Sequence, residues 1–193
     1  MTQPARLATV IGQDALCRLL ARLVARGKLP HAVLLEGVPG CGRRTVARAL
    51  AAALLCQQPV AGDACGACPS CVQVSQGTHP DLLLFPAEGE DAAVDKELTD
   101  AVREMVEGRA YESPLLGGGR VFVIPDIERL QRNQATAANA LLKVLEEPPR
   151  ATWFILTTAF ASGVLRTIVR RQTTASRRAA SIAATRREWR SSG

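Results

Sequence analysis

The stretch that decides the fold is residues 31–50, HAVLLEGVPGCGRRTVARAL. The apolar run at 32–35 predicts a buried strand, and a helical pattern resumes over 43–55. A glycine-rich loop at 37–42 separates the two. Strand, glycine loop and helix in this order are typical of a phosphate-binding loop, because the glycines let successive N–H groups converge on a phosphate at a helix N-terminus. The alternative is a chance glycine turn before a helix.

Two side chains differ from those of the usual phosphate-binding loop. The pattern G-x-x-x-x-G-K-[ST] requires lysine at 43 and a hydroxyl at 44, but this chain has Arg43 and Arg44. Arg44 cannot bind Mg²⁺, and the hydroxyl of Thr45 lies about 100° further around the helix. We therefore expect no productive binding of ATP and Mg²⁺. The degenerate loop comprises Gly37, Gly40, Gly42, Arg43, Arg44 and Thr45.

Strands and helices alternate along the rest of the chain. Apolar runs predict three more strands, at 81–85, 121–124 and 152–158. Helical patterns cover 13–27, 96–109 and 134–147, the last stopped by two prolines. This alternation predicts an α/β fold, a parallel sheet with helices on both faces.

Composition limits the protein class. The 193 residues allow one domain with a small appendage, and 47% hydrophobic residues supply a core. No run of 18 apolar residues and no secretory signal are visible, so we expect a cytoplasmic protein without membrane contact. Residues 166–190 carry a charge of +7 within a total of +6, leaving the remainder near neutral. We expect the Arg/Ala/Ser-rich range 173–193 to be disordered, with a nucleic-acid-binding arm as the alternative.

Four of the six cysteines are grouped in one segment. Cys56, Cys65, Cys68 and Cys71 are spaced so that tight turns can direct four thiolates at one tetrahedral ion. In a cytosolic protein this spacing favours zinc over disulfides, and a four-cysteine set leaves no open position for catalysis. The sequence predicts a structural Zn²⁺ site, with four reduced cysteines in a loop as the alternative.

Several motifs together resemble the bacterial clamp-loader AAA+ subunits of DNA polymerase III, most closely the delta-prime branch. The resemblance covers roughly residues 7–171. It is carried by LLCQQP at 54–59, C-G-x-C-x-x-C at 65–71, GTHPD at 77–81 and A-N-A-L-L-K-x-L-E-E-P-P at 138–149.

The resemblance implies an AAA+ nucleotide-binding domain over 1–172, with the zinc module inserted at 56–71. The resemblance stops near Arg171, and we expect the family's lid and collar domains to be missing from this sequence. Our hypothesis is that the reading frame shifts near Val169 or that the gene model is truncated. The family loads the sliding clamp onto primed DNA within the polymerase III holoenzyme. By resemblance, this chain is a stator without intrinsic ATPase whose partners are the gamma/tau and delta subunits, the clamp and primed DNA.

Two further features are implied by the resemblance. After the third strand an active subunit has aspartate then glutamate, for Mg²⁺ and the attacking water, whereas this chain has Pro125 and Asp126. Arg171 aligns with the arginine that the family lends to its neighbour's ATP site, although it could be a solvated arginine in a basic tail.

Two enzyme hypotheses compete with the stator. One is an ATP-hydrolysing gamma/tau-type motor with Arg43 in place of lysine. The other is a zinc-containing nucleoside-phosphate kinase, which lacks the same magnesium ligands and leaves the 138–149 motif unexplained.

Overall fold

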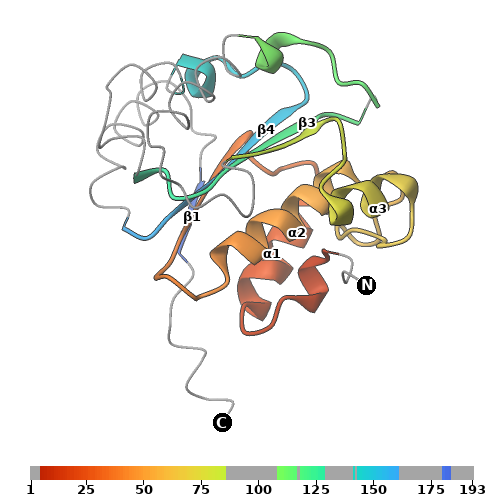
Figure 1. The fold of residues 1–193 in the computed structure, drawn as a ribbon. Coiled ribbons are helices and arrows are strands. Elements are labelled where there is room, and N and C mark those ends of the chain that lie inside the picture. The colour runs from red at the N-terminus through yellow and green to blue at the C-terminus, as the bar shows by residue number, and fades with distance from the viewer. Residues whose placement is uncertain are drawn as a thin grey trace.

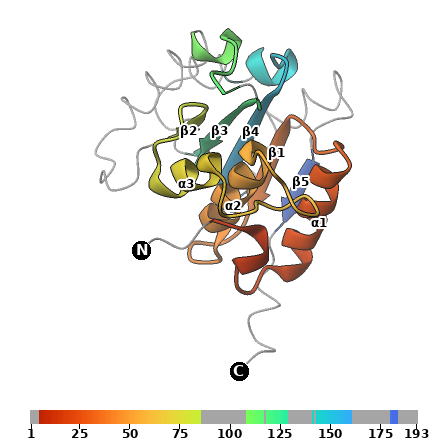
Figure 2. The ribbon, with the colours of Figure 1, turned by 90° about the vertical axis from the view of Figure 1, so that its right-hand side faces the viewer.

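The computed structural model describes residues 5–85, 108–116, 118–128, 141, 143–160 and 180–183. Within these residues, one parallel sheet of five strands has the order β2-β3-β4-β1-β5. Figure 2 shows the strands side by side in this order. The strands are β1 (Ala32–Glu36), β2 (Leu82–Leu84), β3 (Arg120–Ile124), β4 (Thr152–Thr158) and β5 (Ala180–Ala183).

Helices cover both faces of the sheet, as Figure 1 shows. One face carries η1 (Leu7–Thr9), α1 (Asp14–Ala25), α2 (Arg43–Leu55) and α3 (Pro69–Gln76). On the other face lie η2 (Arg109–Tyr111) and a helical segment at 143–146. The expected architecture of a parallel sheet between helices is therefore confirmed. In the part of the chain that the structure describes, no helix is both long and apolar enough to cross a membrane.

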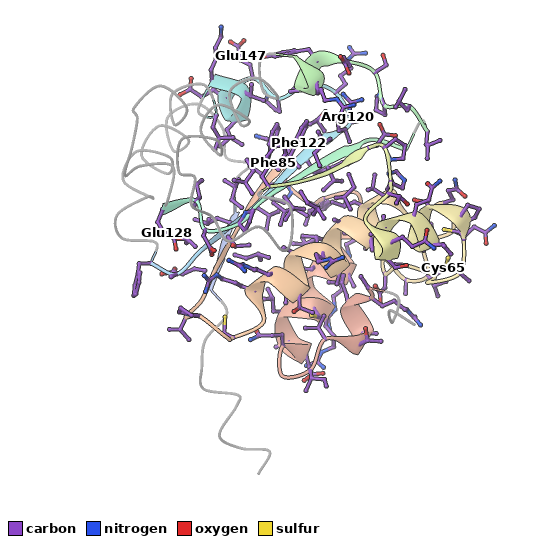
Figure 3. All side chains as sticks on the ribbon, in the orientation of Figure 1. Cys65, Phe85, Arg120, Phe122, Glu128 and Glu147 are labelled. Carbon is purple, nitrogen blue, oxygen red and sulfur yellow. The ribbon has the colours of Figure 1, made fainter. Side chains whose placement is uncertain are left out.

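The sheet divides the core into two layers by side-chain alternation. Val33 and Leu35 of β1 pack in the α1–α2–α3 layer, whereas the intervening Leu34 packs in the opposite layer. This period of two is what a strand buried on both faces requires. In the opposite layer, the rings of Phe122 and Phe154 stack with centroids 5.0 Å apart; Phe122 is labelled at the sheet in Figure 3.

The alanine-rich helix α2 lies closest to the sheet. Its buried positions include Ala47, Ala49 and Ala51, whose small side chains allow close approach to β1, β3 and β4. It also packs against α1 and α3. This helix therefore links the glycine loop at its start with the cysteine segment at its end.

The predicted elements agree with the structure over much of the described chain. The helix expected at 13–27 is α1, the one expected at 43–55 is α2, and the strand expected at 152–158 is β4. The 96–107 part of the helix expected at 96–109 lies outside the described residues. So does most of the helix expected at 134–147, whose described residues 141 and 143–146 are helical.

Besides the short 3-10 helices η1 and η2, one α-helix and one strand of the described residues were not predicted. Helix α3 follows the cysteine turns, because Cys68 caps it by accepting from the Cys71 N–H and Pro69 occupies its first turn. Strand β5 lies within the range 173–193 that we expected to be disordered. For residues 180–183 that expectation is corrected, because their backbone pairs in parallel with β1. The rest of the range lies outside the described residues.

Candidate functional site

The glycine loop leaves the carboxyl end of β1 and turns into α2. The Gly37 N–H donates to the Thr158 carbonyl at 3.0 Å, which fixes the start of the loop on β4. Gly40 and Gly42 have φ values of 81° and 86°, a region that favours glycine. Gln13 Nε2 donates to the Cys41 carbonyl at 3.0 Å and so ties the loop to the entry of α1. The loop thus has the strand–turn–helix setting that the sequence predicts.

The first arginine of the loop is turned into the protein. Arg43 is 8% exposed. Its Nη1 donates to the Gly37 carbonyl at 2.7 Å and its Nη2 donates to Asp126 Oδ1 at 2.6 Å. The guanidinium at the lysine position therefore binds the Gly37 carbonyl of the loop and the carboxylate of Asp126, which is 83 residues away in sequence.

The second arginine contacts the same carboxylate. Arg44 Nη2 donates to Asp126 Oδ2, so each carboxylate oxygen receives one guanidinium. Asp126 follows β3 in a left-handed conformation, with φ of 50°. Its N–H donates to Thr157 Oγ1 at 3.1 Å, and the next N–H, of Ile127, donates to the Thr157 carbonyl at 2.9 Å. Two consecutive hydrogen bonds to β4 therefore hold the carboxylate between the arginines.

In the cluster of Arg43, Arg44 and Asp126, the two positive charges favour the ionised form of the Asp126 carboxylate. Burial alone would raise the pKa of Asp126, but hydrogen bonds from Arg43 and Arg44, together with their charges, lower it below its usual value. The cations that would face a phosphate thus face a protein carboxylate instead. Thr45 is exposed and supplies no hydroxyl to the cluster.

The four predicted cysteine ligands lie together at the other end of α2. The Sγ atoms of Cys56, Cys65, Cys68 and Cys71 are all within 4.8 Å of one another. Cys56 and Cys68 Sγ are 3.9 Å apart, as are Cys65 and Cys71 Sγ. A tetrahedral Zn–S₄ site with bonds of about 2.3 Å has sulfur–sulfur edges of about 3.8 Å. The four sulfurs are close enough to bind one metal ion.

Backbone N–H groups point at these sulfurs. Cys65 Sγ accepts from the N–H groups of Ala67 and Cys68, and these hydrogen bonds lower the pKa of Cys65 to about 6. Burial raises the pKa of Cys71. The Cys65 thiol therefore ionises more readily than an ordinary cysteine, which favours its binding to a metal as a thiolate near neutral pH.

The cysteine module is anchored to the body by specific contacts. Ser70 Oγ donates to the Leu55 carbonyl at 2.6 Å. Asp63 Oδ1 accepts from the Leu7 N–H at 2.8 Å, and Asp63 Oδ2 accepts from the Ala8 N–H at 3.0 Å. The 13-residue α2 separates the module from the glycine loop by about 20 Å. In Figure 3, Cys65 accordingly lies at the opposite end of the molecule from Glu128, which follows β3.

A second buried ion pair involves the GTHPD motif. Asp81 accepts from the N–H groups of Leu115 and Leu116 at 2.8 and 2.9 Å and contacts Arg120 Nη2 at 3.4 Å. Arg120 also donates to the carbonyls of Arg109, Glu112 and Ser113. This pair fixes segment 108–116 against the sheet, which explains structurally why an aspartate ends the motif.

The structure thus places most of the predicted site residues. It brings together the four cysteines, and it places the loop residues at the carboxyl edge of the sheet. Arg171 lies outside the described residues. Sequence reasoning considered Asp126 only as the residue at the position of a glutamate, and it did not identify Thr157 as the anchor of Asp126. Two adjacent arginines after a glycine loop were the available signal that a nearby carboxylate should be sought.

Comparison with known proteins identifies close relatives. The family described as "DNA polymerase III, delta subunit" matches residues 12–178. DNA polymerase III subunit delta' of Escherichia coli K12 is 41% identical over 143 residues, covering 74% of this chain and 40% of that protein. Subunit delta' of Pseudomonas aeruginosa is 39% identical over 150 residues, covering 78% and 44%. The chain therefore spans less than half the length of these relatives.

Subunit tau of DNA polymerase III is also related to this chain. DNA polymerase III subunit tau of E. coli K12 is 34% identical over 156 residues, covering 81% of this chain and 23% of that protein. Among solved structures, a gamma subunit-related protein of Thermotoga maritima has a TM-score of 0.50 at 20% identity, covering 86% of this chain and 45% of that one, a likeness of fold alone. The family match and the delta' relatives together show that this chain belongs to the DNA polymerase III delta-subunit family, as a relative of its delta' subunits.

Proposed function

We propose that this chain works as a delta-prime-like, non-catalytic subunit of the cytoplasmic DNA polymerase III clamp loader. The observation that carries the proposal is the commitment of both loop arginines to Asp126. Such a loop lacks a free cation for the β- and γ-phosphates, and Pro125 and Arg44 cannot ligate Mg²⁺. In this role the chain assembles with gamma/tau and delta subunits and helps place the sliding clamp on primed DNA.

Binding and turnover of ATP test this proposal. The purified chain is titrated with a fluorescent ATP analogue with and without Mg²⁺, and phosphate release is followed in parallel. We expect neither magnesium-dependent micromolar binding nor turnover. A gamma/tau motor subunit with an intact loop is the positive control. Steady ATP hydrolysis by this chain would replace the stator with the motor hypothesis.

Assembly is tested separately from nucleotide binding. The chain is mixed with purified gamma/tau and delta subunits and analysed by size exclusion, and clamp loading is then measured on primed DNA. The proposal requires the chain to enter the complex and to raise loading above that of the other subunits alone. A chain that remains separate would contradict the proposed partners.

We further propose that the cysteine cluster holds a structural Zn²⁺ ion. Its support is the tetrahedral sulfur spacing and the absence of an open position in a four-thiolate set. The ion would link the end of α2 to α3, while remaining too distant from the glycine loop for chemistry there. Metal analysis should give one zinc per chain and should show its loss in Cys65→Ser. Cys41→Ser, which changes a free cysteine in the loop, should retain the metal.

Arg171 is proposed to act on the neighbouring subunit's ATP, as the family resemblance implies. An arginine that reaches a phosphoryl group stabilises charge in the transition state. In a reconstituted loader, Arg171→Ala should lower ATP turnover while leaving assembly intact. Arg170→Ala, one position earlier, is the matched control. Equal loss in both variants would indicate a general effect of basic charge instead.

A further inference from the structure

Asp126, which follows β3, lies where the two guanidinium groups at the end of the glycine loop converge. Arg43 and Arg44 each donate to a different oxygen of its carboxylate. The carboxylate is fixed from behind, since the N–H groups of Asp126 and Ile127 both donate to Thr157. Two cations on two oxygens of one anion is also how arginines bind a phosphoryl group.

Arg43 has hydrogen-bonding capacity that the protein does not use. Its side chain is 9% exposed. Within the described residues, its buried Nε finds no acceptor. A phosphoryl group has more acceptor oxygens than a carboxylate, so it could satisfy donors that Asp126 leaves unpaired. The unpaired Nε of Arg43 is therefore a donor that an anion with more oxygens could engage.

We propose that Asp126 is a built-in anion that closes the phosphate loop, and that neutralising it exposes a magnesium-independent site for a diphosphate anion. The inference rests on the proposed function in one respect, namely that the unmodified loop holds no nucleotide. Asp126 is then the group that occupies the anion site of the loop, and diphosphate anions are the ligands that it excludes.

The chemistry of the loop specifies the ligand. The glycine loop and the start of α2 favour negative charge, and two fixed arginines add cations there. Arg44 stands at the position where the usual loop has its Mg²⁺-binding hydroxyl, and a neutralised Asp126 offers no charged ligand for a metal. The two arginines would thus replace the metal, and Mg²⁺ would compete for the ligand rather than assist its binding.

The test is calorimetric titration of the full chain with inorganic pyrophosphate, in the presence and absence of Mg²⁺. Asp126→Asn removes the charge with little change of shape, and Asp126→Ser is a second neutral variant. Glu146→Gln, an exposed site on the opposite face, removes the same charge away from the loop. Asp126→Asn/Arg43→Ala removes the proposed anion-binding cation as well.

The expected result is a dissociation constant for pyrophosphate at least tenfold lower in Asp126→Asn than in the unmodified chain, without a requirement for Mg²⁺. The gain should be absent in Glu146→Gln and should disappear in the double variant. Equal affinity of the unmodified chain and Asp126→Asn would overturn the inference, as would unfolding of both neutral variants, because Asp126 would then be a structural anchor. ATP turnover by the unmodified chain is measured separately and bears on the proposed function alone.

Discussion

Replacing Asp81 by asparagine tests the buried ion pair that holds segment 108–116. Asp81 is fully buried and Arg120 is 3% exposed. The substitution leaves the Arg120 guanidinium without its buried counter-charge, although the amide oxygen can still accept from one of the two N–H donors at Leu115 and Leu116. Breaking a buried pair from one side costs about 3–5 kcal/mol. We expect a loss at the lower end, about 3 kcal/mol of unfolding free energy, because one hydrogen bond is retained.

The structure offers a matched control on the same arginine. Glu112 Oε2 lies 3.7 Å from Arg120 Nη1, but its side chain is 62% exposed. Solvent screens such a pair, so Glu112→Gln should cost less than about 1 kcal/mol. Urea unfolding followed by circular dichroism gives both values, provided that the m-values agree. The reasoning fails if Asp81→Asn costs no more than Glu112→Gln.

The dependence on pH gives the same prediction a second readout. Burial raises the pKa of Asp81, but the Leu115 and Leu116 N–H groups and then Arg120 lower it below its usual value. A lowered folded-state pKa means that the stabilisation is complete above about pH 4, the unfolded value, and is lost as pH falls through the folded pKa. The difference between the unmodified chain and Asp81→Asn should therefore shrink on acidification below pH 4. A difference that grows instead would contradict the assigned sign.

Three further outcomes are expected. Gly62→Ala should lower the free energy of unfolding by at least about 2 kcal/mol, because the new Cβ would lie 2.0 Å from the Ala21 carbonyl oxygen of α1. The control is Gly12→Ala, where the glycine has a similar φ but a Cβ would meet no atom within 4 Å. This control should lose only about 1 kcal/mol, and urea unfolding measures both variants. Thr157→Val leaves the Asp126 N–H without its acceptor and should cost about 1–3 kcal/mol by the same assay, and a cost near zero would show that the hydrogen bond is dispensable. A zinc chelator should lower the melting temperature of the unmodified chain but not that of Cys65→Ser, and equal shifts would refute a metal-dependent fold.

Much of the fold follows from patterns within short stretches. The apolar run before Gly37 and the helical pattern after Gly42 predicted β1 and α2, since alternation and helical spacing depend on neighbours only a few residues apart. Helix α3 was missed because its first turn consists of cysteine, proline and serine, which are also typical of tight turns. Strand β5 was missed because a four-residue Ala/Ser/Ile run becomes a strand only when β1 supplies hydrogen-bond partners.

The candidate site likewise has features that follow from local sequence and features that depend on tertiary contacts. The sequence by itself determined the glycine loop, the missing magnesium ligands and the four-cysteine set, because each depends on residue chemistry and local spacing. Only the tertiary structure decided that Arg43 and Arg44 meet Asp126, and that Asp81 meets Arg120, 39 residues away. Side chains so far apart in sequence come together only when strand order and register bring their strands' ends to one edge of the sheet, and no local pattern encodes that order.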